Sequence, residues 1–122
     1  MPSINEHYPK RVILYARVAS EAQAENPDAL EQHFAPLRTF ARRKGYEVIA
    51  EIADVGWSGH STDRPGINRA FGTAAQEDVF ALLAGNRDRF SRDLGDLLYL
   101  DKEFGEHGCK LFGVAEMEAG DA

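Results

Sequence analysis

The sequence predicts an α/β fold in which helices cover both faces of a mainly parallel sheet. Short apolar runs rich in β-branched residues alternate along the chain with longer amphipathic segments. This alternation is typical of right-handed βαβ crossovers, which place helices on both faces of a parallel sheet. The length of 122 residues is that of one domain.

Four apolar runs are predicted strands, over residues 11–16, 46–53, 79–84 and 109–114. The first of them is continuously apolar, as expected for a strand that is buried on both faces.

Three segments between these runs are predicted helices. The first begins at Asn26, which caps it ahead of Pro27, and stops at Gly45. The second opens at Pro65, with Ile67, Ala70, Phe71 and Ala74 on its apolar face. The third spans about 93–107, ends at Gly108, and is expected to bury Leu94, Leu97, Leu98 and Phe104.

The remaining residues predict loops and ends. A polar loop follows the first strand, and residues 54–64 and 85–92 form two further loops. The sequence therefore divides into a disordered lead over 1–10, a domain over 11–116 and an acidic tail over 117–122.

Composition excludes several classes of protein. No apolar run approaches the roughly 20 residues of a spanning helix, and the N-terminus lacks a signal-peptide pattern, so we expect a soluble intracellular protein. The single Cys109 can form neither an internal disulfide nor a thiolate metal site with a second cysteine. The net charge of −6 argues against holding nucleic acid by bulk electrostatics, so any contact with a polyanion must be local.

Arginines follow three of the predicted strands. Arg17 comes after the first strand and Arg64 lies in the loop after the second, while the loop after the third carries Arg87, Arg89 and Arg92. Ligands of open parallel sheets bind beyond the carboxyl ends of the strands. Arginine suits bidentate recognition of phosphate, so a phosphate is the candidate ligand. Surface ion pairs are the alternative interpretation of the same residues.

Three ordered motifs resemble the catalytic domain of the serine recombinases, the resolvase and invertase family. They are Tyr15-Ala-Arg17-Val-Ala19-Ser20, Gly59-His-Ser-Thr-Asp63-Arg64-Pro-Gly66 and Asp88-Arg89-Phe-Ser-Arg92-Asp93-Leu-Gly-Asp-Leu. The resemblance spans about residues 11–116. It implies a resolvase-like three-layer α/β/α sandwich with a mainly parallel sheet of four to five strands.

The resemblance also implies an activity. Members cut DNA by attack of a serine hydroxyl on a phosphodiester, which leaves a 5′-phosphoserine link, and they exchange strands within a tetramer without a metal or other cofactor. It implies DNA as partner, a homodimer or tetramer in the full-length active form, no membrane, and the cytoplasm of a prokaryote, with a phage or mobile element as origin. Arginines then stabilise the charge of the transition state.

Site residues carry over position by position. Arg17, Arg64, Arg89 and Arg92 match the phosphate-binding arginines of the family, and Asp88 matches its active-site aspartate. Tyr15 matches the tyrosine before the first arginine, with simple packing as the alternative role. Arg87 has no matching role and is expected to be a surface charge.

Two positions depart from the family pattern. Ala19 stands where the family has its nucleophilic serine, and alanine has no hydroxyl with which to attack phosphorus. His33 stands where the family has a glutamine. Ser20 is a possible substitute nucleophile, but in an extended chain it faces away from Arg17. Further hydroxyls near the site, each expected to cap a loop, are Ser58, Ser61 and Ser91.

We therefore expect the chain to be inactive in strand cleavage, and whether Ala19 is natural or introduced stays open. Family members continue into a dimerisation helix and a DNA-reading domain, so the chain is expected to be a fragment or a standalone remnant. The first alternative function is a non-catalytic oligomerisation or regulatory module, which exposed apolar residues on the helix over 93–107 would favour. The second is a phosphate- or nucleotide-binding doubly wound domain, which the lack of a Gly-x-Gly-x-x-Gly or Walker motif after the first strand disfavours.

Overall fold

A parallel sheet forms the centre of the molecule. The computed structural model describes residues 9–56 and 64–120. The strands are β1 (Arg11–Val18), β2 (Glu47–Val55), β3 (Ala81–Ala84) and β4 (Lys110–Gly113). Within the described residues they form one four-stranded sheet in the order β2-β1-β3-β4, and every pairing is parallel. The predicted mainly parallel sheet of four to five strands is confirmed.

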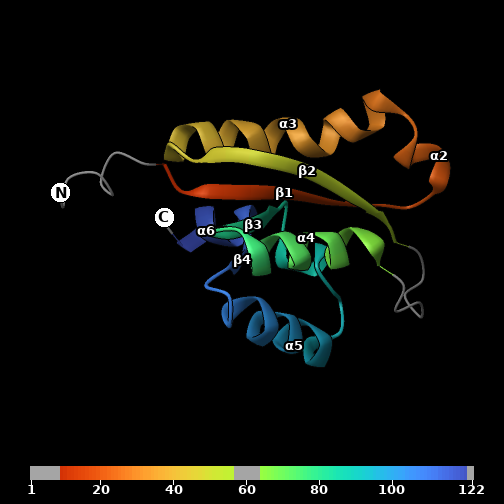
Figure 1. Ribbon diagram of the computed structural model, residues 1–122. Helices are drawn as coiled ribbons and strands as arrows, with labels where there is room; N and C mark the ends of the chain where they lie inside the picture. The colour runs from red at the N-terminus through yellow and green to blue at the C-terminus, as the bar shows by residue number, and fades with distance from the viewer. Residues whose placement is uncertain (1–8, 57–63, 121–122) are drawn as a thin grey trace.

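Helices cover both faces of this sheet and make the fold three-layered. They are α2 (Glu21–Ala24), α3 (Pro27–Lys44), α4 (Pro65–Gln76), α5 (Leu94–Gly105) and α6 (Val114–Gly120), with a 3₁₀ turn, η1, at Arg87–Arg89. Figure 1 shows α3 on one side of the sheet and α4 with α5 on the other. Val114 and Met117 of α6 pack into the same apolar cluster as the buried side chains of α3.

The predicted caps of α3 are confirmed. The Asn26 side chain accepts hydrogen bonds from the N–H groups of Asp28 and Ala29, at 2.9 and 3.4 Å. At the other end Gly45 has a φ of 75°, a left-handed conformation that glycine adopts without strain.

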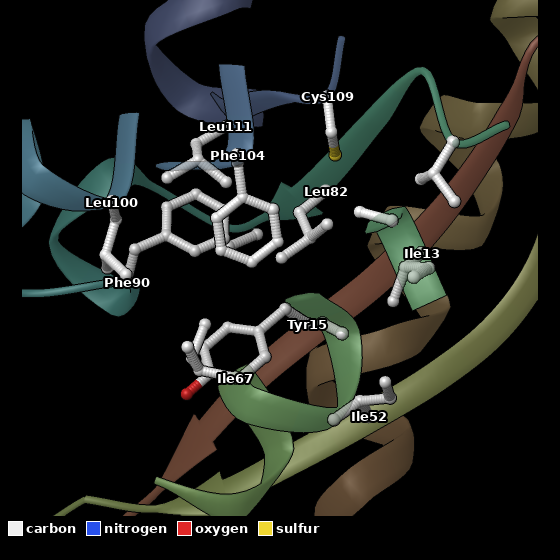
Figure 2. Close-up of a cluster of buried hydrophobic side chains, with 14 of the residues drawn as sticks. Ile13, Tyr15, Ile52, Ile67, Leu82, Phe90, Leu100, Phe104, Cys109 and Leu111 are labelled. Atoms are coloured by element: carbon white, nitrogen blue, oxygen red, sulfur yellow. The ribbon is translucent and has the colours of Figure 1, made fainter. Parts of the chain in front are cut away.

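Strand β1 lies between two apolar cores, one on each face of the sheet. Leu14 and Ala16 face the cluster that contains α3, whereas Ile13 and Tyr15 face the cluster that contains α4 and α5. Figure 2 shows the second cluster. Because both faces of β1 are covered, its sequence is apolar without the polar alternation of a half-exposed strand.

The structure differs from the sequence prediction at several boundaries. Both long strands extend beyond their apolar runs, so Asp54 lies in β2 and not in the predicted loop. Pairing with β1 continues to Val55, which shows that ladder formation, and not apolarity, sets the end of the strand. The polar loop after β1 contains the short helix α2, and the segment that includes the predicted acidic tail is helical in α6 up to Gly120.

Helix α5 buries fewer residues than predicted. Leu97, Leu100 and Phe104 face the sheet, whereas Leu94 and Leu98 are 69% and 57% exposed. The prediction that Leu94 and Leu98 are buried is wrong, because the apolar stripe of this sequence is wider than the face of α5 that carries Leu97, Leu100 and Phe104. None of the helices in the described ranges is both long and apolar enough to cross a membrane.

Candidate active site

A buried carboxylate links the carboxyl ends of β1 and β2 to the start of α4. Asp54 is only 3% exposed. Its Oδ1 accepts from the N–H of Gly66 at 2.6 Å, and its Oδ2 accepts from the N–H of Ile67 at 2.9 Å. The side chain of Arg64, the residue before the helix, makes no capping bond. Asp54 therefore caps α4 from a neighbouring strand, with its charge at the positive end of the helix dipole.

The third donor to Asp54 is Tyr15. The buried Tyr15 hydroxyl donates to Asp54 Oδ2 at 2.6 Å, and its ring stacks on Phe90 at 5.7 Å between centroids. Burial, and after it the hydrogen bond to Asp54, raise the pKa of Tyr15 far above its ordinary value, while the charges of Arg17 and Arg64 oppose this rise. The phenol therefore stays protonated and acts as a donor. Both guanidiniums lie close enough to act on it.

Arg17 lies near the end of β1, in register with Asp54 of the neighbouring strand β2. Its side chain lies against Gly56, where an added Cβ would overlap the Arg17 side chain. No role for Gly56 is predicted from the sequence. A side chain at this position would displace Arg17 from where it lies.

Arg64 is held in place by two partners. Its Nη1 donates to the backbone carbonyl of Phe90 at 2.6 Å, and its Nη2 donates to Asp96 at 2.9 Å. The side chain is 13% exposed. These contacts fix the guanidinium between the start of α4 and the segment after β3, and Asp96 partly neutralises it.

The segment after β3 brings the third group of predicted residues to the same edge of the sheet. Asp88, Arg89 and Arg92 are all exposed there. Burial first, and then the charge of Arg89, lower the pKa of His33 in α3, so the arginine and the imidazole are neighbours. Both line an open cavity of about 280 Å³ between α3, α6 and the turn after β3. It lies between β1 and β3, where the strand order reverses.

The nucleophile position is also described. Ala19 is exposed directly after β1, and its N–H donates to Gln23 Oε1 at 2.8 Å. Ser20 caps α2, because its Oγ accepts from the N–H of Gln23 at 3.2 Å. This reciprocal arrangement resembles a capping box and gives the Ser20 hydroxyl a structural task. Ser91 likewise accepts from the N–H of Asp93, at 3.1 Å, as the capping expectation states.

Ser58 and Ser61 lie outside the described residues. Within 9–56 and 64–120 no group of His, Cys, Asp and Glu side chains is arranged to hold a metal ion.

Arg87 differs from its prediction as a surface charge. It is half-buried, and its Nη2 donates to Asp101 of α5 at 2.6 Å. Its Nη1 donates to the backbone carbonyl of Leu111 in β4 at 2.7 Å. Nothing in the sequence around Arg87 indicates that two distant elements, α5 and β4, contact it.

The predicted residues therefore gather along one edge of the sheet in two groups. Tyr15, Arg17 and Arg64 lie on the α4 side, while Arg89 lies with His33 on the α3 side. Asp54 is not among the residues predicted from the sequence, although its position as an acidic residue at the end of an apolar run is a signal for it.

Comparisons with known proteins identify the family of the chain. The family described as "Resolvase, N terminal domain" matches residues 12–122. A protein of Bacillus subtilis (strain 168), provisionally named a DNA recombinase, is 26% identical over 103 residues, which cover 84% of this chain and 20% of that protein. The chain thus spans about a fifth of the length of this curated relative.

Solved structures share both fold and sequence with the chain. The C-terminal catalytic domain of ISC1926 TnpA, an IS607-like serine recombinase, is 31% identical with a TM-score of 0.70, over 83% of this chain and 67% of that one. The N-terminal catalytic domain of TP901-1 integrase is 29% identical with a TM-score of 0.75, over 88% and 79%. A resolvase family site-specific recombinase from Streptococcus pneumoniae is 28% identical with a TM-score of 0.71, over 88% and 73%. The chain belongs to the resolvase N-terminal domain family, which comprises the catalytic domains of serine recombinases.

Proposed function

We propose that this chain is a serine recombinase catalytic domain that holds a scissile DNA phosphodiester at the carboxyl edge of β1 and β3 but lacks the nucleophile that cuts it. The observation that carries the proposal is the gathering of Arg17, Arg64 and Arg89 along one sheet edge in a chain of net charge −6. A local concentration of guanidiniums in an acidic protein favours a local polyanionic partner.

The geometry supports separate tasks for these residues. The charges of Arg17 and Arg64 both act on Tyr15, whose hydroxyl donates to Asp54. The Arg64 guanidinium is also pre-oriented by Phe90 and Asp96. Such fixed donors stabilise charge on non-bridging phosphate oxygens without reorganising during the reaction. Asp88 and Arg92 are exposed beside this edge and complete the proposed set.

In the reaction, a serine hydroxyl gives up its proton as its oxygen bonds to phosphorus, and the bond from phosphorus to the 3′ oxygen breaks. The leaving oxygen takes up a proton, so that one strand ends in a 5′-phosphoserine and the other in a 3′-hydroxyl. Ala19 presents a methyl group at the position of that serine, so cleavage is expected to fall by a factor on the order of 10⁴ to 10⁶. Ser20 does not replace it in the proposal, because its hydroxyl caps α2.

The test is covalent capture of DNA. The chain is joined to a sequence-specific DNA-binding domain and mixed with duplexes whose nicked cleavage region is randomised in sequence. We expect no adduct from the Ala19 protein and a protein–DNA adduct from Ala19→Ser, which persists when Ser20→Ala is added. An adduct on the unchanged protein that disappears with Ser20→Ala would assign the chemistry to Ser20.

A second candidate function is a non-catalytic oligomerisation module. The observation that favours it is the exposed apolar face of α5, formed by Leu94, Leu98 and Tyr99, which are 69%, 57% and 58% exposed. Such a patch favours contact with another protein surface, here a second copy of the chain. The two candidates are compatible, since the active form in the proposal is a homodimer or tetramer acting on DNA in a prokaryotic cytoplasm.

A further inference from the structure

The start of α6 is bonded to the turn that carries Asp88 and Arg89. Glu116 lies in the first turn of α6, and its two carboxylate oxygens lie 3.1 and 3.4 Å from the backbone N of Arg87, which donates to them. Ala115 adds a second bond, because its N–H donates to the carbonyl of Gly85 at 3.0 Å. Helix α6 and the turn after β3 are therefore joined on either side of Asn86.

The side chain of Arg87 fixes the same turn from the other direction. It forms a two-pronged ion pair with Asp101 of α5, with contacts of 2.6 and 3.2 Å. The nearby carboxylates of Asp101 and Glu116 raise the pKa of Arg87 above its ordinary value. Since arginine stays charged at every relevant pH, the ion pair persists. The first residue of η1 is thus held by α5, β4 and α6 together.

Gly113 shows how closely these segments approach. A Cβ at this position would overlap the Glu116 carboxylate and would lie 2.5 Å from the backbone N of Arg87 and 2.8 Å from the carbonyl carbon of Asn86. Backbone atoms of the turn cannot yield as the end of a side chain can. A glycine at the end of β4 is therefore a condition for the contact between Glu116 and the turn.

We propose that Glu116 is a positioning residue for the phosphate site, which holds η1 through the N–H of Arg87 and thereby couples α6 to the placement of Asp88 and Arg89. This inference rests on the proposed function for the meaning of the site. The placement itself is independent of that function and can be measured without a ligand.

The titration of His33 reports the placement of Arg89. Other groups around the same cavity are Gln32, Asn86 and Glu118. Glu116→Ala is expected to raise the pKa of His33 in nuclear magnetic resonance titrations of the full chain, because a released η1 carries the Arg89 charge away from the imidazole. Removing the negative charge of Glu116 would by itself lower the pKa of His33. A rise in this pKa therefore identifies movement of Arg89.

Three further variants separate position from charge. Glu116→Gln loses the same charge but keeps an oxygen that accepts from Arg87, so the pKa of His33 is not expected to rise. Glu118→Ala removes a carboxylate from the same helix that is paired with Arg43, and no rise is expected there either. Gly113→Ala changes no charge but displaces the turn, and it is expected to raise the pKa of His33 as Glu116→Ala does.

A double variant tests the route of the effect. In an Arg89→Ala background, Glu116→Ala is expected to cause no further rise, since the charge that it displaces is already absent. Thermal unfolding of each variant confirms that the folded state is being titrated. An unchanged or lowered pKa of His33 in folded Glu116→Ala, or a rise of equal size in the Arg89→Ala background, would overturn the proposal.

Binding of inorganic phosphate measures the consequence for the site. Glu116→Ala is expected to weaken it by about three- to tenfold, the effect of one lost hydrogen bond, and Glu116→Gln to restore it. Phosphate that fails to bind the unchanged chain contradicts the proposed function but not the positioning by Glu116. Phosphate that binds both proteins equally overturns the coupling while leaving the proposed function intact.

Discussion

The Tyr15 hydroxyl donates to Asp54 Oδ2 at 2.6 Å in the interior of the protein. Asp54 also accepts from two backbone N–H groups of α4, so one carboxylate joins β1, β2 and the first turn of a helix. Arg64 immediately precedes that turn, and Arg17 is in register with Asp54. Two of the arginines that are proposed to bind phosphate are therefore placed beside a buried hydrogen-bond network.

Removal of the Tyr15 hydroxyl measures the strength of this network. Tyr15→Phe leaves the buried carboxylate with one donor fewer, which is expected to lower the free energy of unfolding by about 2 kcal/mol. Chemical denaturation is the measurement. Tyr99→Phe is the matched control, because Tyr99 is 58% exposed and its change is expected to stay within about 0.5 kcal/mol. Equal losses in the two variants would contradict a special role for the pair.

Two glycines of α4 give a second comparison within one helix. A Cβ at Gly66 would lie 2.7 to 2.9 Å from the Asp54 carboxylate, so Gly66→Ala is expected to destabilise the protein by about 1–3 kcal/mol. Gly72 has no atom within 4 Å of an added Cβ, so Gly72→Ala is expected to stabilise by about 0.5–1 kcal/mol. Denaturation curves with the same sign for both variants would refute the crowding at Asp54.

The sequence predicted much of the fold because its signals are local. The Asn26 and Gly45 caps and the continuous apolar run of β1 depend on neighbouring residues, and the structure confirms them. The site, in contrast, depends on contacts between segments that lie far apart in the sequence. Asp54 stands 39 positions from Tyr15, and Arg87 stands 14 positions from Asp101, so no local sequence pattern predicts either pair.

Asp96 competes with phosphate for Arg64 in the proposed site. Asp96→Asn removes the competing charge while the Phe90 carbonyl still orients the guanidinium, so the affinity for inorganic phosphate is expected to rise by about two- to fivefold. Nuclear magnetic resonance titration with phosphate is the measurement. Glu77→Gln makes the same charge change at the remote pair with Arg11 and is expected to have little effect at moderate salt. A similar gain in both would show a general charge effect and not release of Arg64.

His33 makes the stability of the fold depend on pH. Burial and Arg89 hold the pKa of His33 below its ordinary value of 6.5, so the unfolded chain binds more protons as the pH falls. Above pH 6.5 the imidazole therefore does not lower the free energy of unfolding. As the pH falls from 6.5 through the pKa of His33 in the folded state, the free energy of unfolding decreases. His33→Gln is expected to flatten the fall in unfolding free energy below pH 6.5. The exposed His107, changed in the same way, serves as control, and identical profiles for the two variants would contradict the assignment.

The exposed face of α5 predicts self-association. Leu94 and Leu98 are one helical turn apart, and Tyr99 adjoins them, so burial of this face against a second copy removes a continuous apolar strip from water. Sedimentation velocity at several concentrations is expected to show a mass that increases with concentration, and Leu98→Lys is expected to keep the chain monomeric. Ala75→Lys introduces the same charge on an exposed position of α4 and is expected to leave association unchanged. If both variants still associate as the unchanged chain does, the contact lies elsewhere and the oligomerisation role loses its support.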